Sequence, residues 1–226
     1  MYIGPSSLRA QGNQYLRVKA GDNPSKVLSA NAKYRYPAFL PGSLIFTNNS
    51  TSTAKFNYNM LLSEMHFIDP KGDTLAIAND PTIQAVRIEK DVYYYEFPKT
   101  YWVLLYDYGT AKLMGKQSLA LIDSEKEGGY GQSTGSSSIT NKTTFSSSNS
   151  SIAKLNNQAD MLFSKKTAFR LMDNNRKFYT TNQGGFLSLF SKNKQIIKQY
   201  LREKPLDFGQ EEDLKKLLDY CASLPN

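Results

Sequence analysis

Short apolar and aromatic runs alternate with turn signals through the middle of the chain, between residues 56 and 108. This pattern is typical of consecutive antiparallel strands, because each strand needs few residues and the turns favour Pro, Gly, Asn and Asp. The clearest turn is the segment 69–73, in which Pro70 and Gly72 suit a tight reversal. We predict strands over residues 43–47, 54–60 with a continuation through 61–69, 74–78, 82–88, 92–97 and 100–108. A further hairpin is predicted from 111–114 and 117–122, around Gly115 and Lys116.

The segments on either side of this block have a different pattern. Residues 1–40 are polar and rich in turn formers, which favours an extended N-terminal arm with short strands at 15–18 and 33–36. Residues 123–151 are mostly Gly, Ser, Thr and Asn. They offer little apolar surface to offset the entropy of ordering, so a flexible loop is predicted there. A hairpin from 168–172 and 176–180 follows, and Gly184 with Gly185 marks a break.

The end of the chain has helical periodicity. A helix capped by Ser191 is predicted to run to residue 203, where Lys204 and Pro205 stop it. A second helix begins near Gln210, with three acidic residues in its first turn, where the helix dipole favours negative charge. The apolar stripes of the two helices are Ile196, Ile197, Tyr200 and Leu201, and Leu214, Leu217, Leu218, Cys221 and Leu224.

Together these patterns predict a mainly β fold with a C-terminal α part. The antiparallel sheet is expected to be a sandwich or a bent open sheet, because no long helical pattern separates the strands as a parallel sheet would require. The predicted organisation is an N-terminal arm at 1–40, a β domain at 41–190 interrupted by the Ser/Gly-rich loop, and a helical pair at 191–226 packed on the β domain.

Composition adds a charge preference and removes several classes of site. The 226 residues carry a net charge of +8, which favours acidic partners such as anionic surfaces and acidic glycans. The basic residues are scattered and form no stripe of the kind expected for nucleic-acid binding. One cysteine and one histidine exclude an intramolecular disulfide, a Cys-rich zinc site and a multi-histidine metal site. The phosphate-loop, dinucleotide and nucleophile-elbow motifs are absent, and we expect neither cofactor nor metal.

Glu64 and His66 are the first candidates for chemistry. They lie two positions apart on a predicted strand, so their side chains point to the same face. A carboxylate beside an imidazole is able to support acid–base catalysis. The alternative is a polar contact on a strand face, and the lack of an accompanying nucleophile motif favours that alternative.

An aromatic cluster is the second candidate. Exposed tyrosine and tryptophan rings stack on sugars or anchor protein partners, whereas the same residues also form cross-strand pairs inside β cores. Alternation requires at least one face of these strands to be core. The predicted ligand-binding residues are Tyr93, Tyr94, Tyr95, Tyr101 and Trp102.

Two patches of the sequence resemble a family of uncharacterised exported β-rich proteins of Bacteroidetes-type bacteria. One covers residues 56–77 (FNYNMLLSEMHFIDPKGDTLAI) and leads to the aromatic strand at 92–97; the other covers residues 192–224. Members usually begin with a signal peptide, whereas the first residues here lack its apolar central region. The resemblance implies export to the periplasm or cell envelope if a signal peptide has been removed, and a cytoplasmic location otherwise. It transfers no catalytic residue.

These observations leave three functional hypotheses open. The first is a non-enzymatic envelope protein that binds a protein or glycan partner through the aromatic cluster. The second is a hydrolase-like enzyme that uses Glu64 and His66. The third is a binder of anionic surfaces, driven by the positive net charge. No apolar run is long enough to predict a transmembrane segment, and the sequence does not fix the oligomeric state.

Overall fold

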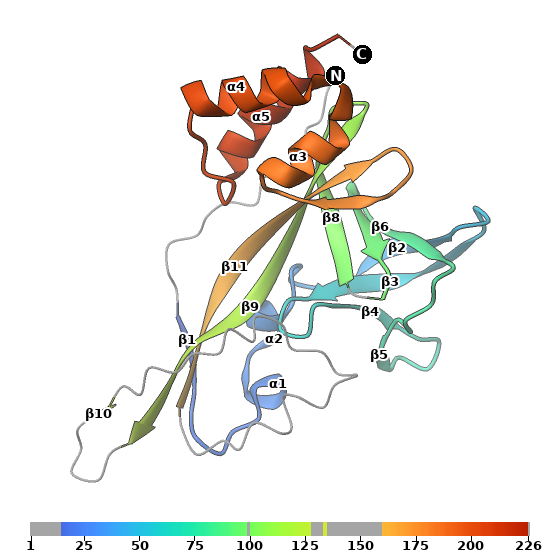
Figure 1. Ribbon diagram of the computed structural model, residues 1–226. Coiled ribbons are helices and arrows are strands. Elements are labelled where there is room, and N and C mark those ends of the chain that lie inside the picture. Colours follow the sequence, from blue (N-terminus) through green and yellow to red (C-terminus); the bar gives the residue numbers. More distant parts are fainter. Residues whose placement is uncertain (1–14, 99, 128–132, 135–159, 226) are drawn as a thin grey trace.

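The structure is a computed structural model that describes residues 15–98, 100–127, 133–134 and 160–225 (Figure 1). Within these ranges the strands are β1 (Leu16–Val18), β2 (Leu40–Phe46), β3 (Thr51–Asn59), β4 (Glu64–Ile68), β5 (Thr74–Ala76), β6 (Ile83–Ile88), β7 (Asp91–Glu96), β8 (Thr100–Asp107), β9 (Ala111–Glu127), β10 (Ser133–Thr134), β11 (Asp160–Asp173) and β12 (Phe178–Thr180). The helices are α1 (Pro24–Val27), α2 (Ala30–Lys33), α3 (Gln183–Leu189), the 3-10 turn η2 (Ser191–Asn193), α4 (Lys194–Glu203) and α5 (Glu211–Ala222).

The described strands form one open antiparallel sheet in the order β1-β11-β9-β8-β7-β6-β2-β3-β4-β5, with β10 beside β9 and β12 beside β11. The sheet bends strongly. The turn between β3 and β4 reaches across it, so that the Met60 carbonyl accepts a hydrogen bond from the Leu119 amide at 2.9 Å. The Ser63 carbonyl similarly accepts one from the Thr100 hydroxyl at 3.1 Å. The predicted mainly β fold with C-terminal helices is confirmed, in its bent open form.

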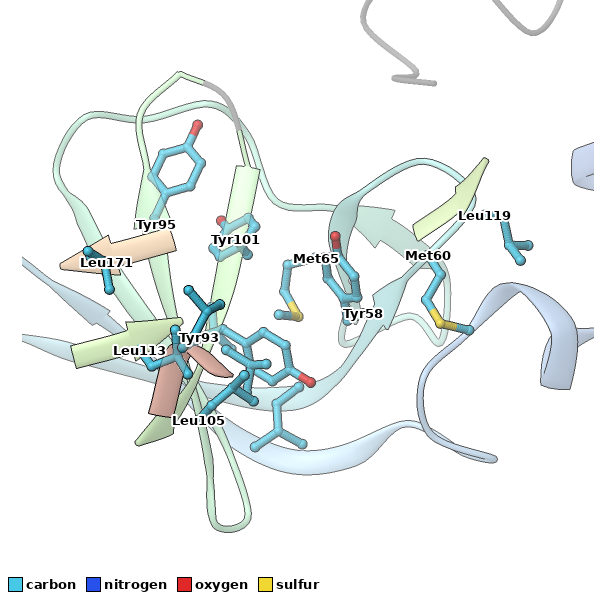
Figure 2. Packing of buried hydrophobic residues seen from close by; sticks show 14 of the residues in the cluster. Tyr58, Met60, Met65, Tyr93, Tyr95, Tyr101, Leu105, Leu113, Leu119 and Leu171 are labelled. Carbon is cyan, nitrogen blue, oxygen red and sulfur yellow. The ribbon is translucent and has the colours of Figure 1, made fainter. Parts of the chain in front are cut away.

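The main core lies on the inner side of this bend. Figure 2 shows side chains of β3, β4, β7, β8 and β9 gathered there, including Tyr58, Met65, Tyr93 and Leu105. Directly opposite residues of neighbouring strands share a face, so the pair Tyr93 and Val103 faces inward and the pair Tyr94 and Trp102 faces outward. The outer face of the sheet therefore carries its own, smaller apolar cluster, formed by Trp102, Met114 and Met172.

The C-terminal helices gather at one end of the sheet, beside β12 and the ends of β9 and β11 (Figure 1). Leu214, Leu217, Leu218 and Cys221 of α5 are buried, as their predicted stripe requires. In α4 the stripe is narrower than predicted, because Ile197 is fully buried while Ile196 remains 44% exposed. None of the helices in the described ranges combines the length and apolar character that crossing a membrane requires.

Several local predictions are wrong. The chain does not continue straight through residues 60–63; it reverses there, and the Asn59 side chain accepts hydrogen bonds from the amides of Leu61 and Leu62. The predicted reversal at Gly115 and Lys116 is absent, because β9 is one long strand whose pairing with β11 spans both residues. Residues 30–33 form helix α2, so the predicted strand at 33–36 is reduced to an isolated bridge at Tyr34.

Two more predictions concern segment boundaries. Gly184 and Gly185 do not end regular structure but lie in the first turn of α3, a helix that the pattern did not indicate. The predicted flexible loop at 123–151 falls mostly outside the described residues. Its described parts are strand, since β9 continues to Glu127 and β10 pairs with it.

Candidate functional site

Glu64 and His66 lie on one face of β4, as predicted, and are in contact. The Glu64 carboxylate is 3.4 Å from Nε2 of His66, and the Tyr34 hydroxyl is 3.0 Å from Nδ1. His66 is 9% exposed, and burial raises the pKa of the Tyr34 hydroxyl despite a hydrogen bond from the Asn59 side chain. Both ring nitrogens thus have partners. These contacts are better explained by a structural role, in which His66 holds the segment around Tyr34 against β4, than by acid–base chemistry.

The five predicted aromatic residues do not share one surface. Tyr93, Tyr95 and Tyr101 lie in the inner core with exposed fractions of 2%, 8% and 5% (Figure 2). Trp102 lies in the outer cluster and is 4% exposed. Only Tyr94 is half-buried, with its ring on the outer face of the sheet. The predicted stacking surface is therefore reduced to one tyrosine on this face.

Trp102 is enclosed by charged groups as well as by methionines. Its Nε1 donates a hydrogen bond of 2.8 Å to the Glu96 carboxylate. The Lys116 ammonium lies 5.0 Å from the ring centroid and the Arg170 guanidinium 5.6 Å, both within cation–π range. Burial lowers the pKa of Lys116, with Glu96 acting in the opposite direction. These contacts surround the buried ring on the outer face of the sheet.

Beside this cluster the outer face is hollowed. Two adjoining hollows of about 160 and 370 Å³ share Thr47, Gln84, Tyr94, Met172 and Arg176 in their walls, so they form one groove, which we call the outer groove. The larger hollow is within the range of about 300–1,000 Å³ that is typical of small-molecule sites. The groove runs between the β2–β3 turn, strands β6 and β7, and the β11–β12 turn.

The lining of the outer groove combines rings with hydrogen-bonding groups. Tyr94, Phe178 and the 49%-exposed Phe97 supply aromatic surface. Side-chain amides come from Gln84, Asn49 and Asn174. Rings flanked by several fixed hydrogen-bonding groups are the chemistry that orients a polar ligand with apolar faces.

The charged side chains that line the outer groove are Lys112, Arg176 and Asp173. Lys112 is engaged by the Asp107 carboxylate at 3.4 Å and by the Asn174 side chain at 3.0 Å. The pKa of the Tyr94 hydroxyl is raised, mainly by burial and secondarily by Asp107, while Arg87 and Arg176 act in the opposite direction. Arg176 is exposed at the rim and lies close enough to influence Tyr94 electrostatically.

Of the predicted ligand-binding residues, Tyr94 and Tyr95 line the outer groove, whereas the groove as a whole was not predicted. The walls of the outer groove come from turns and strands that are distant along the chain, and they meet only because the strand order places β2 next to β6 and β11 next to β9. One signal was available in the sequence. Arg176 stands directly after the predicted turn residues 173–175, at a position where a hairpin favours glycine or asparagine.

Comparison of the chain with protein-family models, curated proteins and solved structures finds no match. The resemblance to exported proteins of Bacteroidetes-type bacteria stays a prediction. Among the described residues, no group of three or more His, Cys, Asp or Glu side chains lies close enough to hold a metal ion.

Proposed function

We propose that the protein is a non-enzymatic binding protein that holds a glycan in the outer groove. The observation that carries the proposal is the half-buried Tyr94 ring set among the amides of Gln84, Asn49 and Asn174. A sugar ring has apolar faces and a rim of hydroxyl groups, so it needs an aromatic face and several hydrogen-bonding groups beside it. A flat protein interface would instead favour a larger, drier surface with a buried hot spot.

A location in the periplasm or cell envelope is part of the proposal, and the resemblance to exported proteins supports it. The positive charge of the chain fits the acidic polysaccharides of such a compartment. The hydrolase-like alternative is less well supported, because the outer groove does not contain His66 and both nitrogens of that ring have partners.

The proposal is tested by the binding of an oligosaccharide panel, followed through the fluorescence of Trp102, the sole tryptophan. Tyr94 and Phe178 pack on the outer cluster that contains Trp102, so a ligand in the groove is expected to change the surroundings of the indole. Tyr94→Ala is expected to weaken glycan binding by about tenfold or more, equivalent to roughly 1.4 kcal/mol, because it removes the stacking face.

Tyr15→Ala is the matched control, because Tyr15 is 51% exposed and lies outside the groove. It should leave affinity unchanged. Equal affinities of the Tyr94→Ala variant and the wild type would contradict the proposed site. If a protein partner binds through this groove and no oligosaccharide does, the ligand is a protein and the glycan proposal is wrong.

A further inference from the structure

Three hairpin loops in this protein share one backbone geometry. In each loop, the amide of residue i donates a hydrogen bond to the carbonyl of residue i+4. Residue i+3 has a left-handed backbone. The first loop links β2 and β3 and places Asn49 at φ 64°. The second links β4 and β5 and places Gly72 at φ 91°. The third links β11 and β12 and places Arg176 at φ 63°.

Arg176 is the unusual member of this set. Glycine adopts the left-handed conformation without a steric penalty, and asparagine tolerates it well. In other residues the approach of Cβ to the following carbonyl disfavours this conformation, and a longer side chain lacks the local hydrogen bonding by which asparagine offsets the cost. The loop itself does not require the arginine, since the loop with Gly72 closes with the same hydrogen bonds, including two amides donated to the Asp69 side chain. The guanidinium is thus present at a cost to the turn.

The position of Arg176 suggests what the guanidinium does. It is exposed and lines both hollows of the outer groove. Within the described ranges, no hydrogen bond or ion pair engages its guanidinium, whereas the Lys112 ammonium across the groove is held by Asp107 and Asn174.

Among the described residues, the acid nearest in sequence forms no direct pair with this guanidinium. Asp173 is the one carboxylate among the lining residues of the outer groove, and its oxygens are occupied by other donors. One accepts the amides of Asn175 and Lys177, each at 2.9 Å, and the other accepts the Tyr179 hydroxyl at 2.9 Å. The groove therefore presents a cation whose hydrogen-bond donors are available to a ligand.

We propose that the glycan bound in the outer groove is acidic, and that its carboxylate or sulfate group pairs with the guanidinium of Arg176. This inference rests on the proposed function and adds the chemical class of the ligand. An arginine fork donates two parallel N–H bonds to an oxyanion, which a lysine cannot match. This pairing explains why an arginine occupies a position that favours glycine.

The test uses two pairs of probes, each made of an acidic oligomer and an uncharged counterpart with the same sugar backbone. One pair is an oligogalacturonate and its fully methyl-esterified form; the other is a sulfated glucose oligomer and its unsulfated parent. Binding is measured by calorimetry and by Trp102 fluorescence. At least one acidic probe is expected to bind about tenfold more tightly than its neutral partner, and the better of the two identifies carboxylate or sulfate as the source.

Arg176→Gly separates binding from folding. It should abolish the preference for the acidic probe, yet raise the melting temperature by about 2–4 °C, because it relieves the left-handed strain in a domain of this size. Arg202→Gln is the matched control: it removes the same charge from an exposed site on α4 and should change affinity by less than about twofold.

The outcomes separate the two proposals. Equal binding of acidic and neutral probes, or an unchanged preference in Arg176→Gly, overturns the acidic ligand and leaves glycan binding intact. A similar loss in Arg176→Gly and Arg202→Gln also overturns it, because binding would then follow net charge. Failure of every oligomer to bind overturns both proposals.

Discussion

At the scale of single residues, the buried and half-buried tyrosines differ in whether their hydroxyl groups have partners. The Tyr36 hydroxyl bonds both the Asp91 carboxylate and the Tyr93 hydroxyl, whereas among the described residues the buried Tyr101 hydroxyl has no partner. An unpartnered buried polar group lowers stability, and a bond to a charged group is worth more than a neutral one.

This difference predicts opposite effects for one chemical change. Tyr36→Phe is expected to lower the free energy of unfolding by about 1–3 kcal/mol, because it removes hydrogen bonds to the buried Asp91 and Tyr93 side chains. Tyr101→Phe keeps the ring that stacks on Tyr95 at a centroid distance of 4.7 Å and removes only the hydroxyl, so stability should be unchanged or increased. Urea unfolding followed through Trp102 fluorescence measures both variants. Equal losses would contradict the assignment of partners.

The predicted site was only partly accessible from the sequence. Strand alternation correctly places Glu64 and His66 together, because that relation is local. It does not reveal that the imidazole contacts Tyr34, which lies 32 positions earlier in the chain. Alternation also leaves open which aromatic face is exposed, and here both faces of β7 and β8 carry apolar clusters. The outer groove depends on long-range strand order, which no local pattern encodes.

At the scale of elements, helix α3 depends on one of its two adjacent glycines. A Cβ on Gly185 would lie 1.9 Å from the Thr180 carbonyl oxygen, so the backbone of β12 leaves room only for glycine. A Cβ on the exposed Gly184 would meet only the Asn182 side chain, at 3.4 Å. Close packing of α3 on β12 therefore requires the second glycine and not the first.

The two glycines form a matched pair for mutation. Gly185→Ala is expected to cost about 1–3 kcal/mol or more, because a backbone carbonyl or the whole helix must move. Gly184→Ala should stabilise by about 0.5–1 kcal/mol, since alanine favours the helical backbone. Thermal and urea unfolding of both variants measure the difference. Tolerance of Gly185→Ala at the wild-type level would show that α3 does not pack on β12 as described.

The elements that sequence patterns predicted correctly are those set by local signals. The turn at 69–73 and the hairpin at 168–180 carry Asp, Asn, Pro or Gly where the backbone needs them. The reversal at residues 60–63 lacks such residues apart from Asn59, and its Met60 and Leu61 are buried, so it has the pattern of a strand. Gly115 suggested a turn, but pairing with β11 along the whole of β9 keeps the strand straight through it.

At the scale of the whole molecule, the bent sheet encloses several tyrosines that must remain protonated. Burial raises the pKa of Tyr58 to about 12 and raises the pKa values of Tyr36, Tyr93 and Tyr101 in the same direction. In the unfolded chain these hydroxyls ionise near the ordinary value of 10. A folded-state pKa above the unfolded one contributes stability at low pH that is lost as pH rises from the unfolded value through the folded one.

The protein is therefore expected to unfold cooperatively in alkali, between about pH 10 and 12. Each such tyrosine lowers the free energy of unfolding by about 1.4 kcal/mol per pH unit in this window. Four of them acting together remove the roughly 5–15 kcal/mol that stabilises a typical domain before all of them can ionise in the folded state.

Phenolate absorbance and Trp102 fluorescence should change at the same pH, because ionisation of the buried tyrosines and loss of the core are one event. Tyr101→Phe removes one of the four groups, so its midpoint should move to higher pH. If the buried tyrosines ionise while the Trp102 fluorescence stays that of the folded protein, the prediction is wrong. Water would then reach the inside of the bend without unfolding.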